Sequence, residues 1–125
     1  MKSLFLAMLV LVATSAHAEL PSSSAAAIRA ALASGRPTVA DFGARTCIPC
    51  KKMAPILEEL SRELKGRANV TFTDVWATPG LAQDYRVQMI PTQIFFDAGG
   101  KEVKRHMGFM DKAAILKELN SAGLK

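Results

Sequence analysis

The chain has few cysteines, histidines and aromatic residues. Its 125 residues include two cysteines, two histidines, one tryptophan and one tyrosine. Zinc usually takes four ligands, and no second cysteine pair stands beside Cys47 and Cys50. Lys51 rather than histidine follows Cys50, which excludes the attachment motif of a c-type haem. Two thiolates can still bind Cu(I), so a Cu(I)-binding module remains open.

The chain also lacks a block of charge of one sign. Lysine and arginine number 16 and aspartate and glutamate 11, which gives a formal net charge of +5. No basic run is interleaved with aromatic residues, so we expect no nucleic-acid binding. The scattered charges are typical of an ordinary solvated surface, and we expect a monomer.

No apolar run reaches the length of a membrane-spanning helix. The run from Leu4 to Ala13 has 10 residues, whereas a spanning helix needs about 20. Lys2 precedes this run, and Ala16-His17-Ala18 is typical of a cleavage site. We therefore predict a cleaved signal peptide over residues 1–18, a single domain over 19–125 and a periplasmic or secreted location without stable membrane insertion. An uncleaved anchor is the alternative.

The two cysteines that are present lie close together in Cys47-Ile48-Pro49-Cys50. A bridge over two intervening residues removes little chain entropy, so it would be a poor structural cross-link. A helix beginning at this point would stabilise a thiolate at the first cysteine. Export would carry the pair into a compartment where disulfides persist. We predict a redox-active pair that is its own redox group, with no metal and no other cofactor.

The hydrophobic pattern predicts an α/β fold. Helices are expected at 22–34, 47–64 and 79–85 and after residue 111, and strands at 37–42, 70–75, 92–97 and 102–107. The first two strands are joined through a helix and should be parallel, whereas the last two should form a hairpin. This order indicates a mixed four-stranded sheet with helices on both faces, and a fifth strand is the alternative.

Several separated motifs resemble the thioredoxin family over nearly the whole of the predicted domain. They are Asp41 six positions before Cys47, Pro55 five positions after Cys50, Ile90-Pro91-Thr92, and Gly108 after the last strand. The resemblance implies a thioredoxin-like fold and a thiol–disulfide oxidoreductase.

The resemblance also implies roles for individual residues. Cys47 would be the exposed nucleophile and Cys50 the resolving thiol. Asp41 would be buried behind the pair and would exchange a proton with it, although an aspartate that caps a turn is the alternative.

A second group of residues would shape the site and bind the substrate. Ile90-Pro91 is expected to be a cis-proline turn that, together with Thr92, presents backbone to an extended substrate. Pro49, Pro55 and Gly108 would shape the site.

Among the positions that depart from the family pattern, three lie close to the cysteine pair in the sequence. Thr46 stands where tryptophan usually precedes the first cysteine, Gly43 stands where an aromatic residue is common, and Ile48 replaces a usual glycine. We expect Trp76 to pack rather than to take part in chemistry.

The favoured function is a protein-disulfide reductase of exported proteins. Its substrates would be protein thiols and disulfides, and a membrane thiol transporter would supply electrons. A periplasmic disulfide oxidase or isomerase is the alternative. Dedicated oxidases of this superfamily usually carry a helical insertion before the cis-proline, and the 41 residues from Cys50 to Pro91 leave no room for one.

Overall fold

Four strands form one mixed sheet. The computed structural model describes residues 19–125, so the predicted signal peptide over 1–18 lies outside the described residues. The sheet has the order β2–β1–β3–β4, with β1 at Thr38–Gly43, β2 at Asn69–Asp74, β3 at Thr92–Phe96 and β4 at Glu102–Met107. Strand β1 pairs parallel with β2 and antiparallel with β3, and β3 pairs antiparallel with β4. The predicted α/β fold with a mixed four-stranded sheet is confirmed.

A short contact takes the place of a fifth strand. Residues Ser22 and Phe72 form an isolated parallel bridge on the outer side of β2. The backbone N–H of Ser23 also donates to the carbonyl of Phe72 at 2.7 Å. The segment before α1 therefore touches the edge of the sheet without extending it into another strand.

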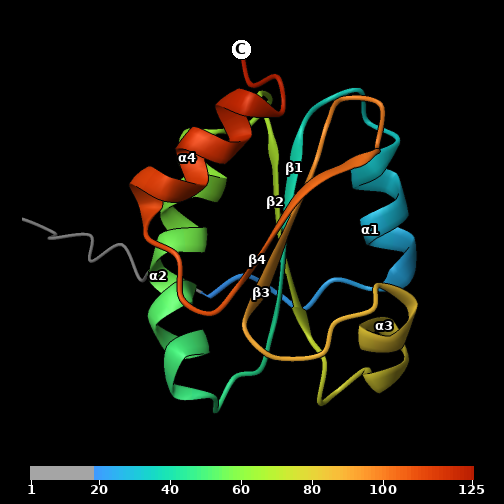
Figure 1. Ribbon diagram of the computed structural model, residues 1–125, viewed down its shortest axis with the longest axis vertical. Coiled ribbons are helices and arrows are strands. Elements are labelled where there is room, and N and C mark those ends of the chain that lie inside the picture. Colours follow the sequence, from blue (N-terminus) through green and yellow to red (C-terminus); the bar gives the residue numbers. More distant parts are fainter. Residues whose placement is uncertain (1–18) are drawn as a thin grey trace, which may run out of the picture.

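Two helices cover each face of the sheet (Figure 1). Helices α1 (Ala25–Leu32) and α3 (Pro79–Asp84) lie on one face, and α2 (Ile48–Glu63) and α4 (Lys112–Ser121) lie on the other. Helix α1 begins three residues later than predicted because the Ser24 side chain accepts the N–H of Ala27 and caps it there. In the same way Asp111 caps α4 through the N–H of Ala114.

The core consists of one apolar cluster on each face. Strand β1 is buried along its whole length, and its side chains alternate between the clusters. Val39 belongs to the cluster under α2 and α4, whereas Ala40 and Phe42 belong to the cluster under α1 and α3. By this alternation Asp41 lies on the same face as Val39. The strand therefore directs its single carboxylate toward the layer that contains α2.

Trp76, which was expected to pack rather than to take part in chemistry, lies outside the core. Its side chain is 62% exposed. It lies in the turn after β2, where its backbone N–H donates to Oδ1 of Asp74 at 2.9 Å. The turn is held by this hydrogen bond, which leaves the ring outside the core.

Among residues 19–125, no helix has the length and apolar character needed to cross a membrane.

Candidate active site

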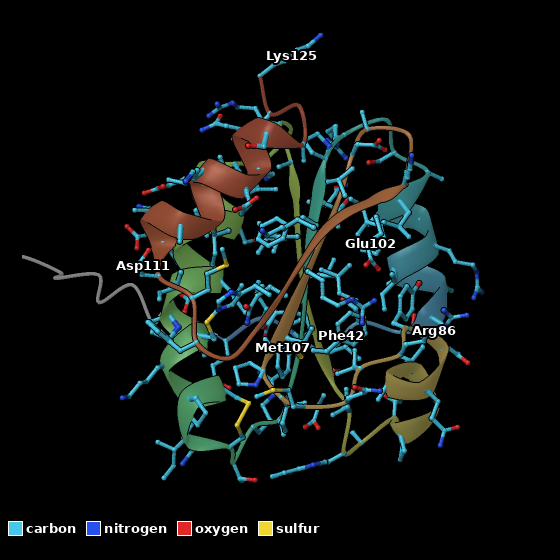
Figure 2. The ribbon with its side chains drawn as sticks, in the orientation of Figure 1. Phe42, Arg86, Glu102, Met107, Asp111 and Lys125 are labelled. Carbon is cyan, nitrogen blue, oxygen red and sulfur yellow. A yellow bond between two sulfur atoms is a disulfide. The ribbon has the colours of Figure 1, made fainter. Side chains whose placement is uncertain are left out.

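The two cysteines meet at the start of α2 and form a disulfide. Cys47 is the N-cap residue of the helix, and the Cα atoms of the pair are 5.1 Å apart. Pro49 fits the first turn because an N–H at that position would have no partner within the helix. The N–H of Cys50 donates to Sγ of Cys47 at 3.4 Å. Figure 2 shows the disulfide at the beginning of α2, at one end of the molecule.

The two sulfurs differ in their access to solvent. Cys47 is partly exposed, whereas Cys50 is 3% exposed. The free N–H groups and the positive end of the helix dipole favour negative charge on the sulfur at the N-cap. A second molecule would therefore meet Cys47 first. This asymmetry is the arrangement that an attacking and a resolving thiol require.

Asp41 lies almost completely buried in the middle of the sheet, 1% exposed. Its Oδ1 accepts a hydrogen bond from Nε2 of Gln93 at 2.9 Å. Its Oδ2 has no hydrogen-bond partner among the residues that the structure describes. Burial raises the pKa of Asp41 from 3.8 to about 7, and the bond from Gln93 opposes this rise only in part. The carboxyl group can therefore change its protonation state near neutral pH.

Gly43 brings the Asp41 carboxyl group close to Cys50. A Cβ atom at position 43 would lie 3.2 Å from Sγ of Cys50 and 3.4 Å from Oδ2 of Asp41. Both atoms therefore lie against the same side of the Gly43 backbone. Both groups border the space that a side chain at position 43 would fill.

The segment before β3 has the conformation that the resemblance implies. The peptide bond between Ile90 and Pro91 is cis. The carbonyl of Pro91 accepts the N–H of Gly108 at 2.8 Å, and Oγ1 of Thr92 donates to the carbonyl of Met89 at 2.6 Å. Gly108 has a φ of +98°, which favours glycine there. The connection from α3 to β3 runs at the same end of the molecule as the start of α2 (Figure 1).

Pro55 lies outside this group of residues. It stands inside α2 on the exposed side of the helix, which continues to Glu63. Having no N–H, it leaves the carbonyl of Lys51 without its α-helical donor. Because Lys51 is exposed, water can satisfy that carbonyl. Pro55 thus belongs to the helix that carries the cysteines but not to their immediate surroundings.

Two parts of the site were missed by the sequence reasoning. Gln93 is the strand partner of Asp41, and a glutamine next to the apolar run Ile94-Phe95-Phe96 was the signal that the sequence offered for it. Arg45 stacks on Phe72 beside Cys50. The sequence contained no local signal for this contact, because Phe72 lies on another strand.

Within residues 19–125, no group of three or more His, Cys, Asp or Glu side chains could hold a metal ion.

Comparisons with known proteins identify the family to which the chain belongs. The sequence model of the thioredoxin family matches residues 21–121. The chain belongs to the thioredoxin family. It is 44% identical over 93 residues to a thioredoxin of Mycolicibacterium smegmatis, which covers 73% of this chain and 82% of that protein. It is 43% identical over 89 residues to a bifunctional thioredoxin reductase/thioredoxin of Mycobacterium leprae, but spans 19% of that longer protein.

Solved thioredoxins have the same fold. Chloroplastic thioredoxin z is 30% identical, with a TM-score of 0.71 over 84% of this chain and 95% of that one. A mutant thioredoxin from Halobacterium salinarum is 28% identical, with a TM-score of 0.73 over 82% and 88%. With its Cys47–Cys50 disulfide, this thioredoxin-family chain is a thiol–disulfide oxidoreductase with protein-disulfide reductase activity on protein substrates.

Proposed function

We propose that this thioredoxin-family protein is exported and reduces disulfides of proteins outside the cytoplasm. The observation that carries the catalytic part is the asymmetry of the pair, with a reachable Cys47 at the helix start and a buried Cys50 against Asp41. The proposal of export rests on residues 1–18, whose sequence is typical of a cleaved signal peptide. Determination of the N-terminal residue of the protein recovered from cells tests it, and Glu19 is expected.

In the first step the thiolate of Cys47 attacks one sulfur of a client disulfide. A bond forms between Cys47 and that sulfur, the client disulfide breaks, and the released client thiolate takes a proton from water. The product is a mixed disulfide between Cys47 and the client. The N-terminus of α2 favours the attacking thiolate because its N–H groups and dipole stabilise negative charge.

In the second step Cys50 gives its proton to Asp41 and attacks Sγ of Cys47. The Cys47–Cys50 disulfide forms, the mixed disulfide breaks, and the second client sulfur leaves and is protonated. Two electrons have then passed from the pair to the client, and no further cofactor is required. A thiol donor returns two electrons by the same exchange in reverse, and we propose a membrane thiol transporter for this role.

The client-binding segment is proposed to be Ile90, Pro91 and Thr92. This segment runs at the end of the molecule where α2 begins (Figure 1), and Gly108 holds it through the carbonyl of Pro91. An extended client strand could lie along its backbone while its sulfur reaches Cys47. Pro49 is proposed to shape the first turn of α2 around the pair, and Pro55 to shape the helix farther from the cysteines. We propose that the protein works as a monomer.

Trapping of clients tests the two roles of the cysteines. The Cys50→Ser variant should accumulate covalent complexes with client proteins, because the mixed disulfide on Cys47 cannot be resolved. The matched Cys47→Ser variant should accumulate none. Non-reducing electrophoresis separates the complexes, and trapping by Cys47→Ser instead of Cys50→Ser would reverse the assignment.

A further inference from the structure

The outer edge of β2 is open where the strand begins. The N–H of Asn69 donates to the carbonyl of Pro37 at 2.9 Å, so this residue faces β1. Backbone groups alternate in direction along a strand, and Val70 and Phe72 therefore face outward. Ser22 forms an isolated bridge with Phe72. Among the described residues, no backbone group pairs with the N–H or the carbonyl of Val70.

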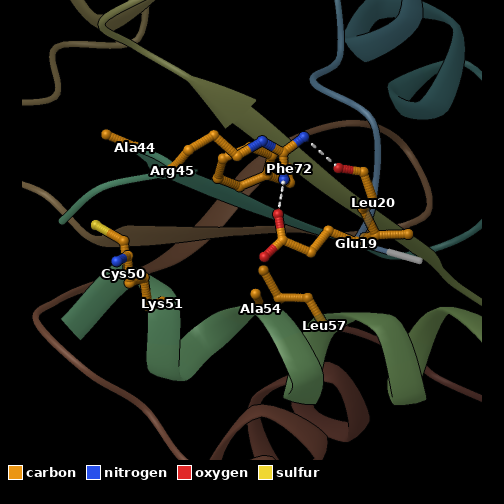
Figure 3. Close-up of a pocket in the computed structure, with 9 residues that line it drawn as sticks. All are labelled: Glu19, Leu20, Ala44, Arg45, Cys50, Lys51, Ala54, Leu57 and Phe72. Atoms are coloured by element: carbon orange, nitrogen blue, oxygen red, sulfur yellow. Dashed lines mark hydrogen bonds and ion pairs between the residues drawn. The ribbon is translucent and has the colours of Figure 1, made fainter. Parts of the chain in front are cut away.

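The segment before α1 covers only the part of this edge at Phe72. Arg45 fixes that segment, because its Nη1 lies 3.1 Å from Oε2 of Glu19 and its Nη2 donates to the carbonyl of Leu20 at 2.6 Å. The guanidinium carbon lies 4.3 Å from the centre of the Phe72 ring (Figure 3). The described part of the segment therefore crosses β2 at Phe72 and does not run along the strand to Val70.

A groove lies against the open part of the edge. Its cavity volume is about 450 Å³, and residues Asn69, Val70 and Thr71 of β2 contribute to its lining. Ala31 of α1 lines one side and Ser61 of α2 lines the other. These two helices cover opposite faces of the sheet (Figure 1), so the groove leads between them to the backbone of β2.

The groove is basic and contains unpaired polar atoms. Arg36 and Lys65 line it, and no aspartate or glutamate does so among the described residues. Nε of Arg36 and Oγ1 of Thr71 are buried, and neither has a hydrogen-bond partner in residues 19–125. Because a buried polar atom without a partner is destabilising, a ligand that offers acceptors to these atoms is favoured. The charges of the groove favour a ligand that is acidic.

We propose that the open edge of β2 binds an extended, acidic segment of a partner protein. The segment adds to the sheet as a further strand and forms main-chain hydrogen bonds with the N–H and the carbonyl of Val70. Its acidic side chains lie against Arg36 and Lys65, on either side of the added strand. The partner is thus recognised by its extended backbone and its negative charge.

A partner in this groove leaves the cysteine pair free. Strand β2 begins at Asn69 beside the groove and ends at Asp74, the strand partner of Gly43. Gly43 in turn lies against Cys50. At about 3.3 Å per residue, the two ends of β2 are roughly 16 Å apart. The groove is therefore a second interaction surface, and the inference goes beyond the proposed reduction of clients at Cys47.

A capped peptide of alternating glutamate and valine is the probe, added to the protein as it is recovered from cells. Amide hydrogen exchange followed by NMR should show slower exchange of the Val70 N–H when the peptide is bound. An NMR titration of the backbone amides gives the dissociation constant. The same peptide with lysine in place of glutamate should bind weaker by about tenfold or more, because its charges repel those of the groove.

Two pairs of variants separate the contacts. Lys65→Glu should weaken binding of the acidic peptide about fivefold, whereas Lys104→Glu, on the opposite edge of the sheet, should leave it unchanged. Val70→Pro removes the outward N–H, which an edge strand tolerates, and should also weaken binding about fivefold. Val70→Ala keeps the N–H and should bind as the wild type does. Lys65 is an exposed side chain, so its variant keeps the test valid if Val70→Pro does not fold.

Equal affinity for the two peptides, unchanged exchange at Val70, or an equal effect of Lys65→Glu and Lys104→Glu would overturn the inference. Slow exchange at Val70 before any peptide is added would overturn it as well. In that case residues 1–18 occupy the edge if only the full-length chain is protected, and a second copy does so if protection rises with protein concentration. The experiment involves no thiol exchange, so its failure is distinguishable from failure of client trapping by Cys50→Ser.

Discussion

Nε2 of Gln93 donates a 2.9 Å hydrogen bond to Oδ1 of Asp41, its partner on the neighbouring strand. Gln93 is fully buried and Asp41 is 1% exposed. The bond lowers the pKa of Asp41, while burial raises it more strongly. Burial alone would keep the carboxyl group protonated up to a higher pH. The hydrogen bond from Gln93 opposes this effect, so the group can ionise near neutral pH.

Replacement of Gln93 should raise the pKa of Asp41 further. In Gln93→Leu the carboxylate loses its hydrogen-bond donor but stays buried, so the protonated form gains relative stability. The pH midpoint of the second step, followed by stopped-flow release of a client from the mixed disulfide, should move above the wild-type value. Gln88→Leu, at an exposed position, is the control. A midpoint that moves downward would contradict the role of the bond.

Asp41→Asn should stabilise the fold in a pH-dependent way. The pKa of Asp41 is about 7 in the folded protein, compared with its ordinary value of 3.8. Between these values the folded protein binds a proton that the unfolded chain has released, so wild-type stability falls as pH rises through this range. Asn is neutral throughout, and the variant should gain up to about 4 kcal/mol above neutral pH and almost nothing near about pH 4. Urea unfolding at both pH values measures the difference, and a gain that is independent of pH would disprove the linkage.

The same substitution should slow the resolving step. Asn cannot accept the proton of Cys50, and no other buried carboxylate lies at Gly43 among the described residues. Release of the client from the mixed disulfide should be slower than in wild type by about 10² or more, while the attack by Cys47 should change little. Stopped-flow reduction of a model disulfide separates the two phases. An unchanged second phase would leave Asp41 with a structural role only.

Gly43→Ala should also slow the second step, for a steric reason. The added Cβ would lie 3.2 Å from Sγ of Cys50, which must give way by a few tenths of an ångström, and 3.4 Å from Oδ2 of Asp41, which is an ordinary contact. Gly80→Ala is the matched control, because a Cβ there meets nothing within 4 Å. We expect slower client release in Gly43→Ala with an unchanged rate of mixed-disulfide formation. Equal rates in the two variants would show that the site tolerates the contact.

The reduction potential should lie nearer the thioredoxin end of the range than the oxidase end. We expect a value below about −200 mV for the Cys47–Cys50 pair. Thr46 and Ile48, which depart from the family pattern beside the cysteines, are the neighbours that would tune it. Equilibration of the protein with glutathione buffers measures the potential. A value near about −120 mV would favour the oxidase alternative.

The sequence by itself determined the order of the elements and the position of the cysteine pair. Alternation and helical periodicity are local properties, so the eight elements could be predicted with ends that differ by a few residues. The larger error, at the start of α1, arose because Ser22 and Ser24 are both good caps and only Ser24 is used. The pairing of Cys47 with Cys50 was local as well, since the two stand in one helical turn.

The tertiary structure alone decided which residues surround that pair. The contact between Asp41 and Gln93 joins residues 52 positions apart, and the contact of Arg45 with Leu20 joins residues 25 apart. The exposure of Trp76 was decided in the same way, because it depends on how a turn leaves the sheet. Strand order and register determine these neighbours. Order and register are in turn set by the burial of whole faces of the sheet rather than by any short segment. The sequence therefore specified the sulfurs, whereas packing specified the burial and hydrogen bonding of the carboxyl group beside them.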